Sequence, residues 1–276
     1  MIDPSNPLAH VRGTVVLAGA GRMGGALLTG WLARGLAPSA VVVLDPHVSD
    51  DIAALAAKGV RINPSPSMIG TVDALVLAVK PQMFAETTVQ LRPLVHAATL
   101  VVSIMAGTTI GAIAAACGGS VVRAMPNTPA AIGRGITVAV PDGAVGAKQR
   151  TLADALLAAT GKVEWLDDET LLDAVTAVSG SGPAYVFLLA EELARAGVAA
   201  GLPAALAARL ARETVAGSGE LLHRSELDAA TLRENVTSPG GTTAAALGVL
   251  MGDGGFQPLL ERAVAAATKR SKELAK

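Results

Sequence analysis

The sequence predicts two domains of different class: an α/β domain with a doubly wound parallel sheet over residues 1–165, and an all-α domain over residues 166–276. Up to about residue 165, short β-branched runs alternate with helix-like stretches, as in parallel sheets that carry helices on both faces. The first three strand-like runs are almost wholly apolar, which is expected of strands buried on both sides. After Trp165 only long Ala- and Leu-rich stretches follow.

The first domain follows a leader, residues 1–12, that we expect to be disordered. The leader has no basic start and no apolar run, so it is not a signal peptide. Five β-branched runs are predicted as strands: Thr14 to Ala18, Val41 to Asp45, Val72 to Val79, Thr99 to Ile104 and Val121 to Met125. Helices are predicted between the early strands: Arg22 to Arg34, Asp50 to the residue before Gly59, and Pro81 to Leu91.

The second domain consists of predicted helices only. Five long apolar stretches carry this prediction: Thr170 to Val178, Pro183 to Ala200, Pro203 to Leu222, Thr242 to Met251 and Phe256 to Leu274. Three of them have a proline near the start, where a missing N–H costs little. The stretches are apolar on more than one face, which exceeds what one small bundle can bury. We therefore predict that this domain dimerises.

Composition argues against several classes of function. Lys plus Arg number 22, Asp plus Glu number 23, and aromatic residues make up 2%, so the chain lacks the basic field and the stacking platforms of a nucleic-acid-binding protein. The single cysteine, Cys117, forms no internal disulfide, which fits a reducing, cytoplasmic location. Residues 93–122 lack Asp, Glu, Lys and Arg and exceed the roughly 20 residues that a membrane span requires. Pro93, His96 and the glycines within them favour a buried core, so we predict no membrane span.

A glycine-rich turn follows the first predicted strand. Residues 19–24 read GAGRMG, which matches G-x-G-x-x-G between a strand and a helix. Gly19 allows a tight turn, Gly21 lets a pyrophosphate approach the backbone, and Gly24 lets the helix pack closely on the strand. The free N–H groups of a helix start favour phosphates. The pattern predicts a Rossmann-type dinucleotide site; the alternative is a flexible turn that binds nothing.

Three polar residues follow later strands. Asp45 lies 21 residues after Gly24. A carboxylate at this place accepts hydrogen bonds from the adenosine ribose and repels a 2′-phosphate, which favours NADH over NADPH. The alternative is that Asp45 only begins a turn with Pro46. Lys80, in AVKPQ, is placed to face the cofactor or is a solvated residue at a helix start. Asn127, in RAMPNTPA, reaches the nicotinamide end or makes a turn.

The helical half contains one loop with binding chemistry. Residues 232–243 read LRENVTSPGGTT, in which Pro239, Gly240 and Gly241 expose the backbone and the threonines open a helix. Consecutive N–H groups at a helix start bind a carboxylate; the alternative is a capped link between two helices. We predict no metal site, because no cluster of His, Cys and Asp has the spacing of ligands.

Taken together, these motifs resemble those of the pyrroline-5-carboxylate reductase family. GAGRMG, AVKPQ, RAMPNTPA, VSGSGPAY (178–185) and NVTSPGGTT (235–243) occur in the family's order and spacing, and the resemblance extends from residue 14 to about residue 274. It implies an enzyme that reduces the cyclic imine Δ1-pyrroline-5-carboxylate to L-proline with NADPH or NADH, the last step of proline biosynthesis. It also implies a homodimer that interlocks through the helical domain and in some members builds into decamers.

The resemblance assigns site residues as well. The glycine-rich turn would hold the cofactor's pyrophosphate through Gly19, Ala20, Gly21, Arg22, Met23 and Gly24. Lys80 and Pro81 would line the nicotinamide side, with Asn127 close by. Backbone N–H and hydroxyl groups would bind the substrate carboxylate at Ser238, Gly240, Gly241, Thr242 and Thr243. The Thr243 hydroxyl would lie near the imine nitrogen as the catalytic group, and Glu226 matches a polar position on the substrate side.

One departure from the family concerns the choice of cofactor. Many members that use NADPH have a small polar or basic residue after the second strand, where this chain has Asp45, Pro46 and His47. Asp45 therefore favours NADH, but Arg22 and His47 can still approach a 2′-phosphate, so the preference stays open.

Two rival functions are compatible with parts of the sequence. The first is a β-hydroxyacid dehydrogenase, a class that uses a lysine on a helix of the second domain. This chain has no lysine between Lys162 and Lys269, which argues against that class. The second is a regulatory protein that senses NAD(P) without turnover. A sensor has no need of the SPGGTT helix start, so that loop favours the reductase.

Overall fold

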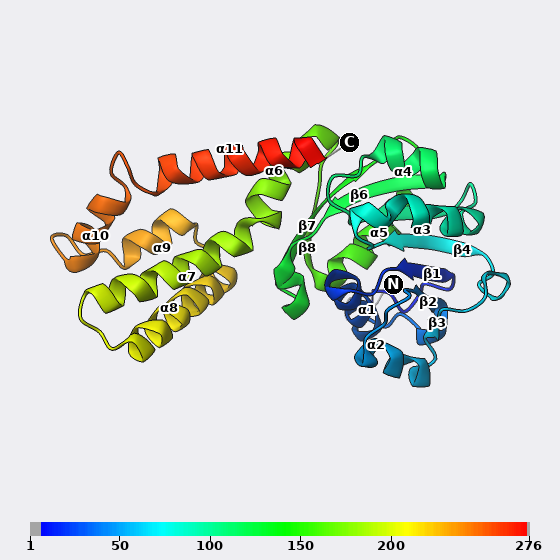
Figure 1. Cartoon of the computed structure of the whole chain (residues 1–276), viewed down its shortest axis with the longest axis horizontal. Helices are drawn as coiled ribbons and strands as arrows, with labels where there is room; N and C mark the ends of the chain where they lie inside the picture. Colours follow the sequence, from blue (N-terminus) through cyan, green and yellow to red (C-terminus); the bar gives the residue numbers. More distant parts are fainter. Residues whose placement is uncertain (1–6, 275–276) are drawn as a thin grey trace. The chain divides into compact units, whose positions relative to one another are not determined.

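Residues 7–274 are described in a computed structural model of the chain (Figure 1). One eight-stranded sheet contains β1 (Thr14–Ala18), β2 (Val41–Leu44), β3 (Arg61–Ile62), β4 (Val72–Leu77), β5 (Leu100–Ser103), β6 (Ser120–Met125), β7 (Gly135–Pro141) and β8 (Gly161–Trp165). The helices on the sheet are α1 (Arg22–Ala33), α2 (Asp50–Ala54), α3 (Phe84–Leu91), α4 (Ile110–Cys117) and α5 (Ala147–Leu157). The later helices are α6 (Leu172–Val175), α7 (Gly182–Ala199), α8 (Ala204–Arg224), α9 (Ala229–Asn235), α10 (Thr242–Leu250) and α11 (Phe256–Leu274).

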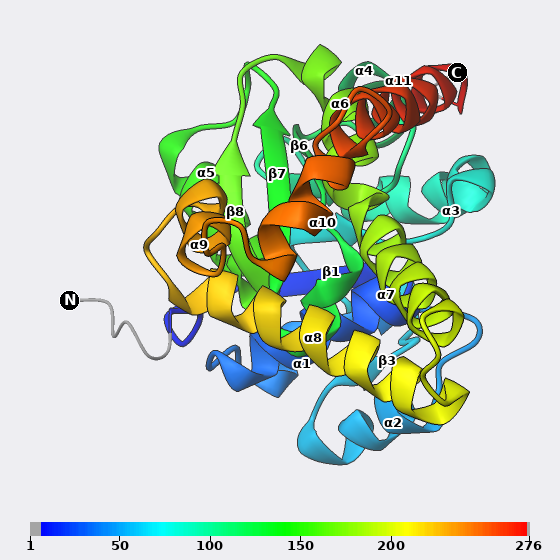
Figure 2. The same ribbon diagram turned by 90° about the vertical axis from the view of Figure 1, so that its left-hand side faces the viewer.

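The strand order is β3-β2-β1-β4-β5-β6-β7-β8, and neighbouring strands are parallel except β6 and β7. Chain order reverses between β1 and β4, which makes the carboxyl ends of these two strands the switch point where such sheets bind ligands. The predicted doubly wound sheet is therefore confirmed. The five predicted strands are present, whereas β3, β7 and β8 were not predicted. Figure 2 shows β6, β7 and β8 side by side at one edge of the sheet.

Helices cover both faces of the sheet, because the strands bury alternate residues in opposite directions. On β1, Val15 and Leu17 pack with α1, α2 and α5, whereas Val16 and Ala18 pack with α3 and α4. All four side chains are fully buried. The two apolar layers explain why the strand sequences are continuously apolar rather than alternating. They hold the strand ends, and therefore the turns that follow them, in a fixed arrangement.

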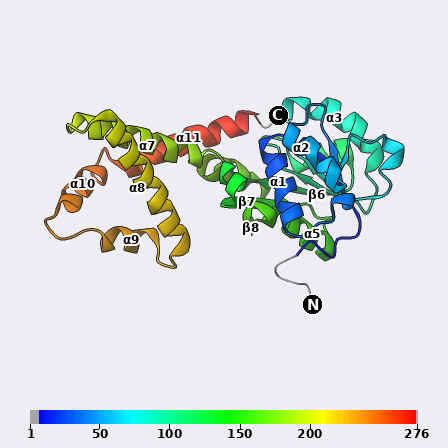
Figure 3. The same ribbon diagram turned by 90° about the horizontal axis from the view of Figure 1, so that it is seen from below.

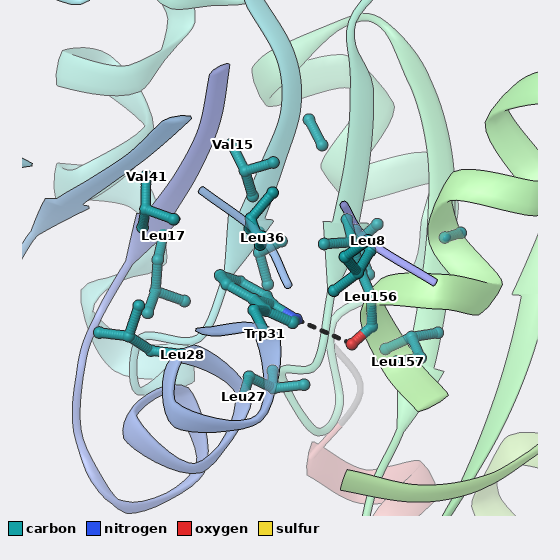
Figure 4. Packing of buried hydrophobic residues seen from close by; sticks show 14 of the residues in the cluster. Leu8, Val15, Leu17, Leu27, Leu28, Trp31, Leu36, Val41, Leu156 and Leu157 are labelled. Carbon is teal, nitrogen blue, oxygen red and sulfur yellow. Dashed lines mark hydrogen bonds between the residues drawn. The ribbon is translucent and has the colours of Figure 1, made fainter. Parts of the chain in front are cut away.

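The predicted disorder of residues 1–12 is wrong for the part of the leader that the structure describes. Leu8 is fully buried in the core beside Trp31 and Leu156 (Figure 4), and its N–H donates to the carbonyl of Arg34. The indole N–H of Trp31 donates to the carbonyl of Leu156 at 2.8 Å. Leu8 anchors the segment, and Val11 packs against the same core, although the leader has no apolar run. Residues 1–6 lie outside the described residues.

The chain forms two compact units. The sheet unit contains Met1–Gly180 and Thr268–Lys276, and the helical unit contains Ser181–Ala267. This division lies later in the chain than the predicted boundary at residue 165. Among the polar contacts that hold residues 166–180 to the sheet unit, Arg123 Nη1 lies 2.7 Å from Glu169 Oε1, and the Ser271 hydroxyl donates to Asp173 Oδ1 at 2.6 Å.

The predicted helix from Thr170 to Val178 is not one regular helix. A 3-10 turn at Glu169–Leu171 and the short α6 are followed by a π-helical turn at Thr176–Gly180. Such turns occur mostly as single insertions and are frequent near functional sites. The other four predicted helices of the second half correspond to α7, α8, α10 and α11, whereas α9 was not predicted.

The helical unit exposes much apolar surface. Helices α7 and α8 pack against each other (Figure 3), yet the outward residues of α7 include Phe187 at 69% exposure and Leu188 at 53%. The segment Glu169–Ala199 is long and apolar enough to cross a membrane by length and composition alone, and 11% of its apolar 18-residue window is buried. A protein partner on this face would account for the same exposure, because exposed apolar patches of this extent mark interaction surfaces.

Candidate active site

The glycine-rich turn has the geometry that a pyrophosphate requires. Gly19 has a φ of +91°. A Cβ there would lie 2.7 Å from the carbonyl oxygen of Ala78, the residue that directly follows β4. A Cβ on Gly24 would lie 2.1 Å from the carbonyl oxygen of Gly19, whereas a Cβ on Gly21 would meet nothing within 4 Å. Gly19 and Gly24 therefore serve close packing, and Gly21 leaves open space beside the backbone.

The start of α1 is free for an anion. Gly21 is the N-cap residue, no side chain caps the helix, and no acidic residue lies in its first turn. Arg22, Met23 and Gly24 form that first turn, so their N–H groups have no carbonyl partner within the helix. These N–H groups and the helix dipole favour a phosphate group. The predicted pyrophosphate residues thus lie together at one helix start.

Asp45 is tied to the glycine-rich turn. Its Oδ2 accepts from the N–H of Ala20 at 2.7 Å, and its Oδ1 accepts from the N–H of His47 at 2.8 Å. Each carboxylate oxygen has a second lone pair that can accept from a ribose hydroxyl. The residue that directly follows β2 therefore also fixes the turn that follows β1.

A cavity of about 860 Å³ opens at the switch point of the sheet. It is lined by predicted cofactor residues Gly19, Gly21, Asp45 and Lys80, and also by His47. Lys80 lines the same cavity as Asp45, as predicted for a residue that faces the cofactor. Cavity size, an open helix start and a ribose acceptor together fit a dinucleotide.

The other predicted cofactor residues lie outside the lining of this cavity: Ala20, Arg22, Met23 and Gly24 of the glycine-rich turn, and Pro81 and Asn127 after later strands. Pro81 begins the 3-10 turn Pro81–Met83 directly after Lys80. Asn127 follows β6, and its Oδ1 accepts from the N–H of Ile136 at 2.9 Å, which leaves its Nδ2 group as the donor. The Oδ1 of Asn127 therefore fixes the backbone at Ile136, and the Nδ2 group of the same side chain can still donate.

Part of the cavity wall was missed by the sequence predictions. One face of α3 and the segments before and after it contribute Met83, Glu86, Thr87, Gln90, Leu91 and Leu94. The segment after β3 contributes Asn63, Pro64, Pro66 and Ile69. The helical spacing of the α3 residues was a usable signal. The segment after β3 gave no usable signal. Strand β3 has only two residues, so the sequence did not predict a strand there whose end could be assigned to the cavity.

The predicted substrate loop forms a defined turn in the helical unit. The N–H of Gly241 donates to the carbonyl of Ser238 at 3.0 Å, and Gly240 has a φ of +68°. Pro239 at the second position and glycine at the third are typical of a type II turn. Gly241 then caps α10 without a side-chain hydrogen bond or an acidic residue in the first turn. This helix start is open to a carboxylate.

The remaining substrate-side residues surround this loop in sequence. Ser238 and Thr242 are exposed and Thr243 is half-buried, whereas Glu226 lies in the exposed link between α8 and α9. Asp228 caps α9, and the N–H of Thr231 that it accepts holds the pKa of this carboxyl below its ordinary value. The part of the chain covered by the structure contains no cluster of three or more His, Cys, Asp or Glu that could hold a metal ion.

Two protein-family models match different parts of the chain. The sequence model described as pyrroline-5-carboxylate reductase dimerisation matches residues 169–274, and the one described as NADP oxidoreductase coenzyme F420-dependent matches residues 14–107. The chain is 40% identical over 265 residues to pyrroline-5-carboxylate reductase of Pseudomonas aeruginosa, covering 95% of this chain and 96% of that one.

Two solved structures are similar over nearly the whole chain. A pyrroline-5-carboxylate reductase from Coxiella burnetii has a TM-score of 0.88 at 33% identity, covering 96% of this chain and 99% of that one. The Plasmodium falciparum pyrroline carboxylate reductase with NADP bound has a TM-score of 0.78 at 28% identity, with the same coverage. The chain belongs to the pyrroline-5-carboxylate reductase family.

Proposed function

We propose that this chain reduces Δ1-pyrroline-5-carboxylate to L-proline with NADH or NADPH, the last step of proline biosynthesis. The observation that carries the proposal is the presence, in one chain, of the dinucleotide cavity at the switch point and the open SPGGTT helix start. Relatives that match this chain over nearly its whole length are pyrroline-5-carboxylate reductases. Membership of that family argues against the β-hydroxyacid dehydrogenase function.

The chain's own residues supply binding and orientation. The first turn of α1 would hold the cofactor's pyrophosphate through N–H groups, and the first turn of α10 would hold the substrate carboxylate in the same way. When bound, the reduced nicotinamide supplies a hydride. Thr243 would place its hydroxyl near the imine nitrogen, where it keeps the protonated imine oriented. Glu226 and Ser238 would complete the polar surroundings of the substrate.

Cofactor preference is a finer proposal. Asp45 keeps a lone pair on each oxygen for the ribose hydroxyls and opposes a 2′-phosphate, so we propose that NADH is preferred. His47 lines the same cavity and Arg22 begins α1, and both can approach a 2′-phosphate, which is why NADPH is still expected to react. The nicotinamide end is proposed to lie toward Pro81 and Asn127.

The decisive experiment follows absorbance at 340 nm with pyrroline-5-carboxylate and either NADH or NADPH. Proline formation with either cofactor supports the reductase function, and the ratio of the two kcat/KM values measures the preference. Tight nucleotide binding without oxidation of either cofactor would instead support a non-catalytic sensor of NAD(P).

We also propose that the chain is a homodimer built through the helical unit. Exposed apolar residues on α7 and the match to a dimerisation sequence model support this. Sedimentation equilibrium at micromolar concentration should give at least a dimer, and assembly of dimers into decamers would appear as a larger species. A monomer alone at that concentration would refute the proposal.

We propose a cytoplasmic enzyme whose cofactor domain ends near residue 165, and whose residues 166–276 bind substrate and partner. Its net charge of −1 and the apolar composition of the sheet support the absence of nucleic-acid and membrane partners.

Thr243 provides a test of the proposed substrate site. Thr243→Ala should lower kcat by about 10²-fold, in the range that a positioned polar group contributes, while the Kd for NADH changes less than about twofold. Thr243→Ser keeps the hydroxyl and should restore most of the activity. Steady-state kinetics and nucleotide titration measure the two quantities. Equal losses of turnover and nucleotide affinity would show that the threonine is only structural.

A further inference from the structure

Asn63 occupies an unusual backbone position at the edge of the cofactor cavity. Its φ is +46°, and it is the only non-glycine residue with positive φ in the part of the chain that the structure describes. It also precedes Pro64, and a following proline disfavours helical backbone conformations and favours extended ones. Asparagine tolerates the left-handed region better than most residues, but the conformation persists only where the surroundings hold it.

The surroundings that hold it belong to Asp45. The Nδ2 group of Asn63 donates to the carbonyl of Asp45 at 2.8 Å, and its Oδ1 accepts from the N–H of Asp45 at 2.9 Å. The backbone N–H of Asn63 donates to the carbonyl of Val43 at 2.8 Å. The side-chain amide therefore pairs with the backbone of Asp45 as a peptide group of a neighbouring strand would.

This pairing takes over where β3 stops. Strand β3 pairs with β2 only through Arg61 and Ile62, and Pro64 cannot donate to a continued ladder. Without the Asn63 side chain, the backbone of Asp45, the first residue after β2, would lose both of these hydrogen bonds. Asp45 in turn holds the Ala20 N–H of the glycine-rich turn through its carboxylate. Three segments, after β3, after β2 and after β1, are thus linked in series.

We infer that Asn63 is a positioning residue for cofactor selection: its side-chain amide fixes the backbone of Asp45 and thereby aims the carboxylate at both Ala20 and the adenosine ribose. The inference rests on the proposed role of Asp45. Asn63 also lines the cavity itself. Its predicted contribution is to discrimination between NADH and NADPH, because only the ribose end of the two cofactors differs.

Asn63→Gly is the informative variant, because glycine keeps the positive φ without strain and removes only the amide. The Kd for NADH, measured by nucleotide fluorescence without any imine, should rise about fivefold, as expected from the loss of two hydrogen bonds that act together. The Kd for NADPH should change less than about twofold. Because no substrate is present, this readout is independent of whether the chain reduces pyrroline-5-carboxylate.

Two controls separate positioning from loosening of the loop. Ser65→Gly adds a glycine to the same segment, at an exposed residue outside the cavity lining, and should leave both Kd values unchanged. Asp45→Ala combined with Asn63→Gly should bind NADH no more weakly than Asp45→Ala alone, since Asn63 acts through that carboxylate.

The opposite outcomes are equally clear. If the Kd values for NADH and NADPH rise equally, Asn63 is only a structural residue and the inference is overturned. The same conclusion follows if the increases in the Kd for NADH caused by Asp45→Ala and Asn63→Gly multiply in the double variant. Unchanged Kd values for both cofactors would overturn it as well. If Asn63→Gly shifts the ratio of the two Kd values while no imine is reduced, the inference stands and the proposed reductase activity fails.

Discussion

Gly19→Ala is expected to remove nearly all cofactor binding. The added methyl group would lie 2.7 Å from the carbonyl oxygen of Ala78 and 2.9 Å from the N–H nitrogen of Val79, so it would collide with backbone rather than with a movable side chain. The φ of +91° adds strain of about 1–2 kcal/mol for any residue but glycine. Relief requires the turn to shift away from β4, and a displacement near 1 Å at a reacting group costs about 10²-fold. We expect kcat/KM with NADH to fall at least about 100-fold.

Comparison with two other glycines separates packing from binding. Gly21→Ala meets nothing within 4 Å, so its melting temperature should be unchanged while its Kd for nucleotide rises, because the methyl group enters the space proposed for the pyrophosphate. Gly143→Ala also has open space and lies far along the chain from the motif, so it should change neither quantity. Gly19→Ala should lower both stability and affinity. Normal nucleotide affinity in Gly19→Ala and Gly21→Ala would contradict the assignment of the site.

The sheet and its site were predictable where the physical signal is local. Strand β1, the glycine turn and α1 are contiguous, and each glycine's role follows from the shape of that one turn. Strand β3 has two residues and no periodicity to detect. Strand β7 pairs antiparallel with β6, and no α-helix lies between the two strands. The alternation of strands and helices that predicts the parallel strands therefore does not predict β7.

The rest depends on contacts between residues far apart in the chain. No local pattern shows that the Asn63 amide pairs with Asp45, or that Asp45 reaches back to Ala20. Leu8 illustrates the same limit: one leucine in a polar leader is buried because Trp31 and Leu156 provide its surroundings. Local propensity predicts elements, whereas these partners are set by tertiary packing.

The ion pair between Arg123 and Glu169 also joins residues that are far apart in the chain, and breaking it should strongly lower stability. Arg123 on β6 is buried, with 7% of its side chain exposed, and its guanidinium lies 2.7 Å from Glu169 Oε1, whose side chain is 28% exposed. The same Oε1 accepts from the N–H of Ile110 at the start of α4. One carboxylate thus neutralises a buried cation and also satisfies a helix start, where a negative charge is favourable.

Glu169→Gln should therefore destabilise the protein markedly, because it leaves the Arg123 charge buried without a counter-ion. Breaking one side of a fully buried pair costs about 3–5 kcal/mol, and the partial exposure of Glu169 lowers the expected loss to just below that range, about 2–3 kcal/mol. Urea unfolding at fixed protein concentration measures the change in the free energy of unfolding, since dimerisation makes stability depend on concentration.

The two partners should not be equivalent. Arg123→Met removes the buried cation and leaves a carboxylate that water can reach, so its loss should be smaller, about 1–2 kcal/mol. Glu273→Gln breaks an exposed pair with Arg270 on α11, whose side chains are 46% and 65% exposed, and should change stability by less than about 0.5 kcal/mol. If Glu169→Gln behaved like Glu273→Gln, the buried pair would contribute nothing to the link between β6 and the segment after β8. Losses in the expected order would show that this segment is held to the sheet by charge as well as by packing.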